Sequence, residues 1–276
     1  MRALGIDIGG TSVKAEILGG SAARSARYDA RDRDALVRAI AEAAAGVGDA
    51  KGFAIGVCAP GALDEATGVV TASVNVPALV GIAPAELVQA SLGTRAARVT
   101  TDAHAAAYDV WASRELQGRL LAVSLGTGVG ACVLDEGEVL RVSGTSSGHL
   151  GQIDVSLDAD PPIAADGSAG TMEAYLGARA LEARFGSAMS DPDWSLDAND
   201  PVLRALAKGL RIAHAIYRPM HIVLLGGVGL RLKSSLPALR RIVEDRLTSL
   251  VRPGWTLSCG EDEFHAARGA ARLALA

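Results

Sequence analysis

The chain has 276 residues, of which 49% are hydrophobic and 21% are charged, and its formal net charge is -4 at pH 7. This length suffices for one large domain or for two modest domains with cores of their own. The small net charge and the scattered Lys and Arg residues argue against a surface for nucleic acid or membranes, since such surfaces concentrate positive charge.

The cysteines and the apolar segments indicate a cytoplasmic protein. Cys58, Cys132 and Cys259 lie far apart among apolar residues, which predicts reduced, buried thiols rather than a disulfide framework. Asp7 interrupts the first apolar run almost at once, so we expect no signal peptide. No uninterrupted apolar segment is long enough to cross a bilayer.

The first predicted element is a β-hairpin over residues 4–18, whose two apolar strands flank a glycine turn. Asp7 ends the first strand, and a buried carboxylate is costly unless it meets a cation or hydrogen-bond donors. Gly9 and Gly10 allow backbone N–H groups to approach an anion, and Thr11 adds a hydroxyl. Two interpretations stay open: a metal ion near phosphates at Asp7, or an ordinary hairpin in which Asp7 helps to form the turn.

Helices and strands alternate after this hairpin. The predicted elements are a helix over 34–47, strands over 52–57 and 68–73, a helix over 84–92 and a strand over 97–100. Asp102 follows the last strand and opens a predicted helix over 103–116. It is either a capping residue or a functional carboxylate, because α/β folds place ligand chemistry at strand ends.

A second hairpin over residues 120–134 repeats the first, with an apolar strand, a glycine-threonine turn and another apolar strand. Two such halves could hold a polyphosphate from both sides, although the turn could also be one more glycine-rich hairpin. The remaining predicted elements are helices over 171–185 and 201–217, a strand over 221–225 that ends in a glycine-rich segment, a helix over 233–250, a strand over 256–258 and a helix over 264–275.

Seven motifs, taken in order, resemble the ROK family (repressors, open reading frames and sugar kinases). They are D-x-G-G-T-x-x-K at 7–14, A-P-G-A-L-D at 59–64, Asn75, T-D-A-H-A-A at 101–106, L-G-T-G-V-G at 125–130, G-H-L-G-Q at 148–152 and L-G-G-V-G at 225–229. The resemblance implies an α/β, actin-like (ribonuclease-H-like) duplicated fold, with ATP and sugar in a cleft between two domains. Repressor members carry an N-terminal helix-turn-helix; this chain begins at the first hairpin, so we expect no binding of nucleic acid.

The resemblance also implies residue roles. Asp102 would be the general base that takes the proton from the attacking hydroxyl, and Asp7 would hold Mg²⁺ through water. The phosphates of ATP would lie by Gly9, Gly10, Thr11, Lys14, Gly126, Thr127 and Gly128, and the adenosine by Gly226, Gly227 and Val228. The sugar would contact Gly61, Asn75, Thr101, Asp102, His149, Gln152 and Glu173, of which Glu173 also suits the dipole of its helix.

The chain departs from the family pattern on the sugar side. Thr101 replaces a typical Asn, His149 replaces a sugar-binding Glu, and Gln152 replaces a His that touches sugar and structural zinc. Residues 166–171 stand where the family has a cysteine-rich zinc loop, so we predict no structural zinc. A mismatched buried polar group costs about 1–3 kcal/mol, so we expect poor binding of glucose itself. His149 could equally face solvent.

Three hypotheses follow for the function. The first is an ATP-dependent kinase that acts on the primary 6-OH of a hexose, an amino sugar or a sugar-like polyol. The second is a non-catalytic sensor of sugar or nucleotide that retains the ROK fold. The third is another actin-like ATPase, such as an acyl-carboxylate kinase or a chaperone-type ATPase.

The predicted domains are residues 1–104, with the first hairpin and the sugar side, and residues 105–262, with the second hairpin and the adenosine site. The C-terminal helix over 263–276 could complete the first domain. A homodimer is the usual state of the family.

Overall fold

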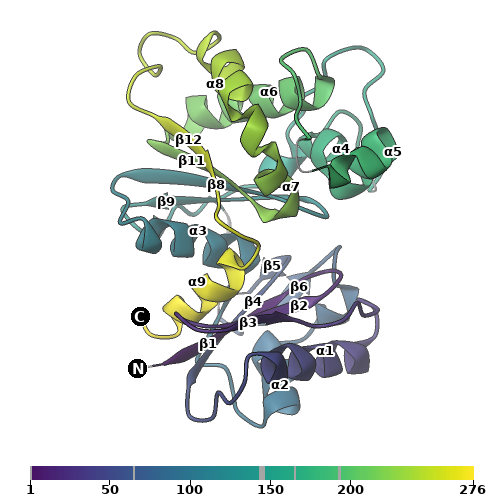
Figure 1. Cartoon of the computed structure of the whole chain (residues 1–276), viewed down its shortest axis with the longest axis vertical. Coiled ribbons are helices and arrows are strands. Elements are labelled where there is room, and N and C mark those ends of the chain that lie inside the picture. Colours follow the sequence, from purple (N-terminus) through teal and green to yellow (C-terminus); the bar gives the residue numbers. More distant parts are fainter. Residues whose placement is uncertain (1, 65, 143–146, 165, 192–193) are drawn as a thin grey trace. The chain divides into compact units, whose positions relative to one another are not determined.

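The computed structural model describes residues 2–64, 66–142, 147–164, 166–191 and 194–276. The chain divides into two compact units (Figure 1). Unit 1 comprises Met1–Leu116, Val139–Ser147 and Phe264–Ala276, and unit 2 comprises Gln117–Glu138 and Gly148–Glu263. The domain boundaries predicted from the sequence stay a prediction.

Unit 1 is built mainly from residues 1–116 of the chain and from the C-terminal helix. Its elements are β1 (Ala3–Ile8), β2 (Val13–Ile17), β3 (Ala22–Arg24), α1 (Arg33–Gly46), β4 (Ala54–Ala59), β5 (Ala62–Leu63), β6 (Val70–Ala72), a 3-10 turn η1 (Pro77–Leu79), α2 (Pro84–Leu92), β7 (Arg98–Thr101), α3 (Asp102–Ser113) and α9 (His265–Leu273). The main sheet has the order β3-β2-β1-β4-β7, in which β1, β4 and β7 run parallel.

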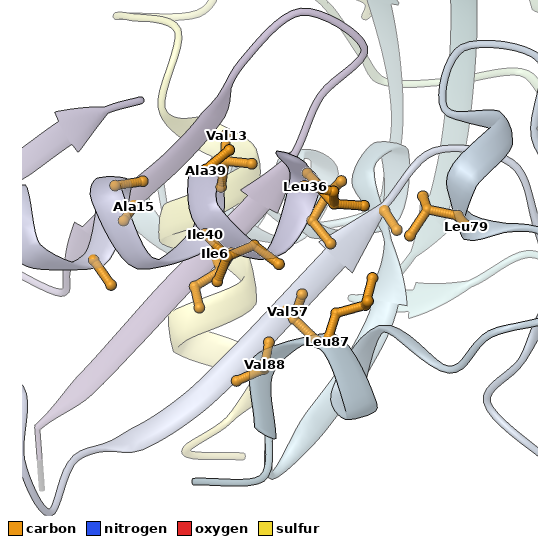
Figure 2. Close-up of a cluster of buried hydrophobic side chains, with 14 of the residues drawn as sticks. Ile6, Val13, Ala15, Leu36, Ala39, Ile40, Val57, Leu79, Leu87 and Val88 are labelled. Carbon is orange, nitrogen blue, oxygen red and sulfur yellow. The ribbon is translucent and has the colours of Figure 1, made fainter. Parts of the chain in front are cut away.

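One face of this sheet packs against α1 and α2. Figure 2 shows Ile6 of β1 and Val57 of β4 among the side chains of Ile40 from α1 and Val88 from α2, and all four are fully buried. Side chains alternate between the two faces of a strand, so the residues before Ile6 and Val57 point to the opposite face.

The opposite face carries α9 in direct contact with the backbone. A Cβ atom at Gly5 of β1 or at Gly56 of β4 would overlap the carbonyl oxygens of Ala267 and Ala270, and a Cβ at Gly269 would overlap the backbone of α3. Glycine is therefore required on both sides of this helix, because any side chain would push the layers apart. This packing places α9 between the sheet and α3.

A buried charge network fixes α3 to α9. Asp109 of α3 is fully buried and accepts hydrogen bonds from His265 Nδ1 (2.7 Å), Arg272 Nε (2.7 Å) and Arg268 (3.1 Å). Arg268 also donates to Glu16 of β2 at 2.8 Å. Burial alone would raise the pKa of Asp109, but the hydrogen bonds from His265 and Arg272 outweigh it and lower the pKa below its usual value.

Unit 2 repeats the mixed sheet with different helices. Its elements are β8 (Arg119–Leu125), β9 (Val129–Asp135), β10 (Glu138–Val139, its last residue assigned to unit 1), η2 (Leu150–Gln152), α4 (Met172–Leu176), α5 (Ala178–Phe185), η3 (Gly186–Ser190), α6 (Pro201–Tyr217), β11 (His221–Leu225), α7 (Gly226–Arg231), η4 (Leu232–Ser235), α8 (Leu236–Glu244) and β12 (Thr256–Cys259). The strand order is β10-β9-β8-β11-β12, with β8, β11 and β12 parallel. Figure 1 shows α6, α7 and α8 on the same side of this sheet.

Two predicted helices were wrong in extent, and one observed helix, α7, was not predicted. The helix over 171–185 breaks at Gly177, because the N–H of Ala178 donates to Gly126 O instead of continuing the helix. The helix over 233–250 is confined to α8, since the following residues include weak helix formers. The glycine-rich segment after β11 forms α7. No helix among the described residues is long and apolar enough to span a membrane.

The buried network gives a prediction for stability. Asp109→Asn removes the charge that three donors share, and water can reach Arg268 and Arg272 only partly. We expect a loss of about 2–3 kcal/mol in urea denaturation, somewhat less than a fully buried broken pair. Glu244→Gln, which breaks the exposed pair with Arg240, is the control and should cost under about 1 kcal/mol. Equal losses of the free energy of unfolding in the two variants would contradict a stabilising role for the buried network at Asp109.

The same network predicts the pH dependence of this difference. The folded-state pKa of Asp109 is lowered, so its contribution is fully present above the unfolded-state pKa and is lost as the pH falls through the folded-state value. The stability gap between wild type and Asp109→Asn should therefore narrow in acid.

Candidate functional site

The parallel strands of unit 1 bring several predicted site residues to one sheet edge. The register places Asp7 beside Cys58 and Cys58 beside Thr100. The carboxyl ends of β1, β4 and β7 therefore lie side by side. The first glycine turn, Gly61 and Asp102 follow directly after these ends.

Asp7 is a nearly buried carboxylate with two neighbours. Lys14, its partner on the antiparallel strand β2, places Nζ 3.4 Å from Oδ2, and the thiol of Cys58 donates to Oδ1 at 3.7 Å. Burial, and secondly the charge of Asp7, raise the pKa of the Cys58 thiol well above its usual value, so the thiol stays protonated.

The donor set at Asp7 fits Mg²⁺ bound together with phosphates. This ion commonly takes one or two carboxylates plus phosphate oxygens and water, rather than a cage of protein ligands. Among the described residues, no three His, Cys, Asp or Glu side chains are grouped so that they could hold a metal ion by themselves. Asp7 would thus need the phosphates of a ligand to complete the coordination.

Asp102 occupies the first position of α3. The N-cap is Thr101, whose hydroxyl accepts from the N–H of His104 at 3.3 Å, so capping does not require the Asp102 side chain. Asp102 Oδ1 accepts from the N–H of Ala103 at 2.8 Å. Burial, and secondly the charge of Asp7, raise the pKa of Asp102 to about 6, a value suited to accepting a proton near neutral pH.

The first glycine turn touches the Asn75 segment. The N–H of Gly9 donates to Ser12 O at 3.2 Å, and a Cβ at Gly10 would lie 3.0 Å from Asn75 O. Thr11 is exposed beside them. Sequence reasoning missed Tyr28, whose hydroxyl donates to Gly9 O at 2.6 Å. Tyr28 lies in an irregular segment after β3, where no pattern indicated a role.

Gly61 has a backbone conformation that only glycine adopts easily. Its φ is +115°, and a Cβ there would overlap the carbonyl oxygen of Ala72. The residue therefore fixes the path of the chain after β4, at the same sheet edge as Asp102.

The second glycine turn and the predicted adenosine residues meet in unit 2. Parallel pairing of β8 with β11 places Leu225 beside Ser124, so residues 126–128 and 226–228 leave the sheet at the same edge. Gly226 has φ +77°, and a Cβ there would overlap the backbone of Leu125. Thr127 is exposed at the turn.

Glu173 lies against the second turn. Its Oε2 accepts from the N–H of Val129 at 2.9 Å and lies 2.6 Å from the position that a Cβ of Gly128 would take. The loop over 148–152 packs nearby, because a Cβ at Gly151 would overlap Val129 O. The side chains of His149 and Gln152 are exposed.

A pocket of about 320 Å³ adjoins the glycines after β11. This volume is at the lower end of small-molecule sites. Its lining includes Asp191, Trp194, Gly227, Leu230, Arg231 and Glu263. Of these, the sequence pointed only to Gly227, because the others come from separate segments with no shared spacing.

The predicted site residues thus form two groups, one in each unit. Unit 1 holds Asp7, Gly9, Gly10, Thr11, Lys14, Gly61, Asn75, Thr101 and Asp102. Unit 2 holds Gly126, Thr127, Gly128, His149, Gln152, Glu173, Gly226, Gly227 and Val228.

Comparisons with solved structures agree with this architecture. The chain is similar to a ROK hexokinase from Thermus thermophilus, with 26% identity, a TM-score of 0.72 and coverage of 98% of this chain and 97% of that one. It is also similar to a ROK family glucokinase from Streptomyces griseus, solved with glucose and AMPPNP, with 20% identity, a TM-score of 0.78 and coverage of 99% of both chains. A third similar structure is a ROK family transcriptional regulator, a homologue of the Escherichia coli MLC protein. The identity is 18% and the TM-score is 0.74, with coverage of 99% of this chain and 78% of that one.

These likenesses define an α/β protein of the actin-like ATPase fold, which confirms the predicted fold class. The family model of the ROK family matches residues 3–276, and the chain belongs to this family. A search of curated proteins found no match to the chain.

The second turn allows a matched test of Glu173. Gly128→Ala should displace the carboxylate from the N–H of Val129 and lower the free energy of unfolding by about 1–2 kcal/mol. Gly126→Ala is the control, because no atom lies within 4 Å of the added Cβ. It should leave stability unchanged or raise it by up to about 1 kcal/mol. If the two variants unfold at the same denaturant concentration, the hydrogen bond between Glu173 and Val129 does not stabilise the turn.

Proposed function

We propose that this protein is an ATP-dependent sugar kinase that phosphorylates a hydroxyl, the primary 6-OH, of a hexose, an amino sugar or a sugar-like polyol. The observation that carries the proposal is Asp102, held at the strand ends beside Asp7 with a pKa raised to about 6. Family membership and the likeness to a ROK hexokinase support it.

In this mechanism Asp102 is the general base. Its carboxylate accepts the proton of the acceptor hydroxyl as the oxygen attacks the terminal phosphorus of ATP, while the bond from that phosphorus to the bridging oxygen breaks and ADP leaves. Phosphoryl transfer passes through a loose transition state, so correct placement of the hydroxyl matters more than a strong base. The hydrogen bond from the N–H of Ala103 orients the carboxylate for this task.

The phosphates of the donor would lie by the two glycine turns. Gly9, Gly10 and Thr11 offer N–H and hydroxyl groups, with the Lys14 ammonium nearby, and residues 126–128 offer the same kind of backbone turn. Asp7 would hold Mg²⁺ through water, and the bound ion would neutralise phosphate charge. The pocket at Gly227 has the volume for part of a nucleoside, which favours adenosine beside residues 226–228.

The acceptor would contact Gly61, Asn75, Thr101, His149, Gln152 and Glu173 in addition to Asp102. Glu173 can serve the second turn through Oε2, and Oε1 would remain for a hydroxyl. An imidazole at His149 offers a different set of donors and acceptors from a carboxylate, so we expect an acceptor other than glucose to be preferred.

The alternative is a non-catalytic sensor of sugar or nucleotide. It is favoured by the altered sugar side, where His149 and Gln152 depart from the family pattern, and by the likeness to a regulator. Calorimetry that shows ligand binding without phosphorylation would support this alternative. For either function we expect a cytoplasmic homodimer without structural zinc.

Turnover with a panel of acceptors tests the kinase proposal. Release of ADP should depend on one of glucose, an amino sugar, a ketose or a cyclitol. Asp102→Asn should lower kcat by roughly 100- to 10,000-fold, since it removes the base but keeps the shape. Full activity in this variant, or no acceptor-dependent turnover with any member of the panel, would refute the proposal.

The pH profile provides a second test. Asp102 must be ionised to accept a proton, so kcat/KM should rise as the pH increases through about 6 and level off above about 7. An aspartate at its ordinary pKa would reach this plateau by about pH 5. The release of ADP is measured with coupling enzymes, so ADP added directly at each pH checks that these enzymes do not limit the measured rate. A flat profile from pH 5 to 8 would rule out a base with a raised pKa.

A further inference from the structure

The segment of residues 25–30, between β3 and α1, holds the first glycine turn through Tyr28. The Tyr28 hydroxyl donates to Gly9 O at 2.6 Å, and the Tyr28 N–H reaches Thr11 O at 3.4 Å. Burial, and secondly the charge of Asp7, raise the pKa of the Tyr28 hydroxyl, so it stays protonated and donates. One residue therefore contacts the turn at both ends.

The hydrogen bond to Gly9 O has a geometric consequence for the next N–H. A trans peptide is planar, so the Gly9 carbonyl and the Gly10 N–H point in opposite directions. A donor that fixes the carbonyl also fixes the direction of this N–H. Among the described residues, the structure shows no acceptor for the Gly10 N–H. The Gly10 N–H therefore points away from the Tyr28 hydroxyl, and we infer that it is available to bind an anion.

The same segment also contacts the chain beyond Asn75. The carbonyl of Ala30 accepts from the N–H of Ala78 at 3.1 Å, and Ala78 lies in η1, three residues after Asn75. Gly10 itself lies against the Asn75 carbonyl. The segment therefore connects the first glycine turn with the predicted acceptor residue Asn75.

Two anchors hold the start of the segment. Ser25 exchanges hydrogen bonds with Val13 of β2, at 2.9 Å through its N–H and 3.0 Å through its hydroxyl oxygen. The N–H of Ala26 donates to Glu42 Oε1 on α1 at 3.0 Å. The segment is thus fixed to a strand and a helix before it reaches the turn.

We propose that the segment of residues 25–30 sets the position of the first phosphate turn relative to the Asn75 segment, and that Tyr28 is a positioning residue for phosphoryl transfer. The proposal rests on the proposed kinase function. Tyr28 acts through the Gly9–Gly10 peptide, which presents its N–H to the phosphates of the donor.

Tyr28→Phe tests this role, because it removes one hydroxyl and keeps the ring. The KM for ATP should rise about five- to tenfold, as expected for the loss of one hydrogen bond. The KM for the acceptor should change less than twofold, because the contacts of Ala30 with Ala78 remain. Tyr108→Phe is the matched control; its ring packs on His104 and Trp111, and those contacts survive. Its kinetic constants should equal those of wild type.

Two further measurements do not need turnover. Calorimetry with Mg·ADP should show an affinity for Tyr28→Phe that is about five- to tenfold weaker, and hydrogen exchange should be faster at residues 9–11, while the melting temperature falls by only a few degrees and the protein stays folded at the assay temperature. If wild type is active and Tyr28→Phe has the same KM for ATP and the same affinity for Mg·ADP, the role of Tyr28 is overturned and the kinase function is unaffected. If wild type binds Mg·ADP but phosphorylates no acceptor, and Tyr28→Phe binds Mg·ADP more weakly, Tyr28 still positions the phosphate turn and the kinase function is refuted.

Discussion

The burial of one carboxylate beside a second one at the same sheet edge governs the candidate site. Asp7 lies near the end of β1 and Asp102 directly follows β7, so the parallel strands keep them at the same sheet edge, and burial weakens the screening by water. Lys14 Nζ lies 3.4 Å from Asp7 Oδ2 and forms an ion pair with it. Burial, and secondly the charge of Asp7, raise the pKa of Asp102 to about 6. A single arrangement thus places one carboxylate beside an ammonium group and makes the other suited to accept a proton.

The duplicated hairpin receives a different side-chain contact in each unit. In unit 1 the Tyr28 hydroxyl donates to a carbonyl of the turn, and in unit 2 the Glu173 carboxylate accepts from an N–H that follows the turn. Both contacts come from residues outside the hairpin, so the turns do not hold their geometry by glycine alone. A preorganised turn loses less conformational freedom when it binds an anion.

The sequence was sufficient where local pattern decides structure. The helix from Pro84 to Leu92 and the strand from His221 to Leu225 were predicted with the observed bounds, because a helix-starting proline and an apolar run are local signals. The break at Gly177 and the contact of Tyr28 with Gly9 were missed, because each depends on a hydrogen bond to a distant segment. The pocket lining at Trp194 and Glu263 was missed because the two residues come from separate segments with no shared spacing. Asp7, Asp102 and the glycine turns lie at strand ends within each unit, whereas Asn75, His149, Gln152 and Glu173 lie in loops or short helices, and the roles of all of them remain proposals.

In the loop over residues 148–152, the residues that fix its path are separate from those that depart from the family pattern. Leu150 and Gly151 are buried, and Gly151 packs against Val129, whereas the side chains of His149 and Gln152 are exposed. The residues that fix the loop are therefore different from those that depart from the family pattern. A substitution at the exposed positions changes hydrogen-bonding groups and leaves the buried contacts of the loop in place. Asp102 lies in another segment, where the N–H of Ala103 holds its carboxylate. This separation favours a kinase with an altered acceptor over a protein that has lost its reaction.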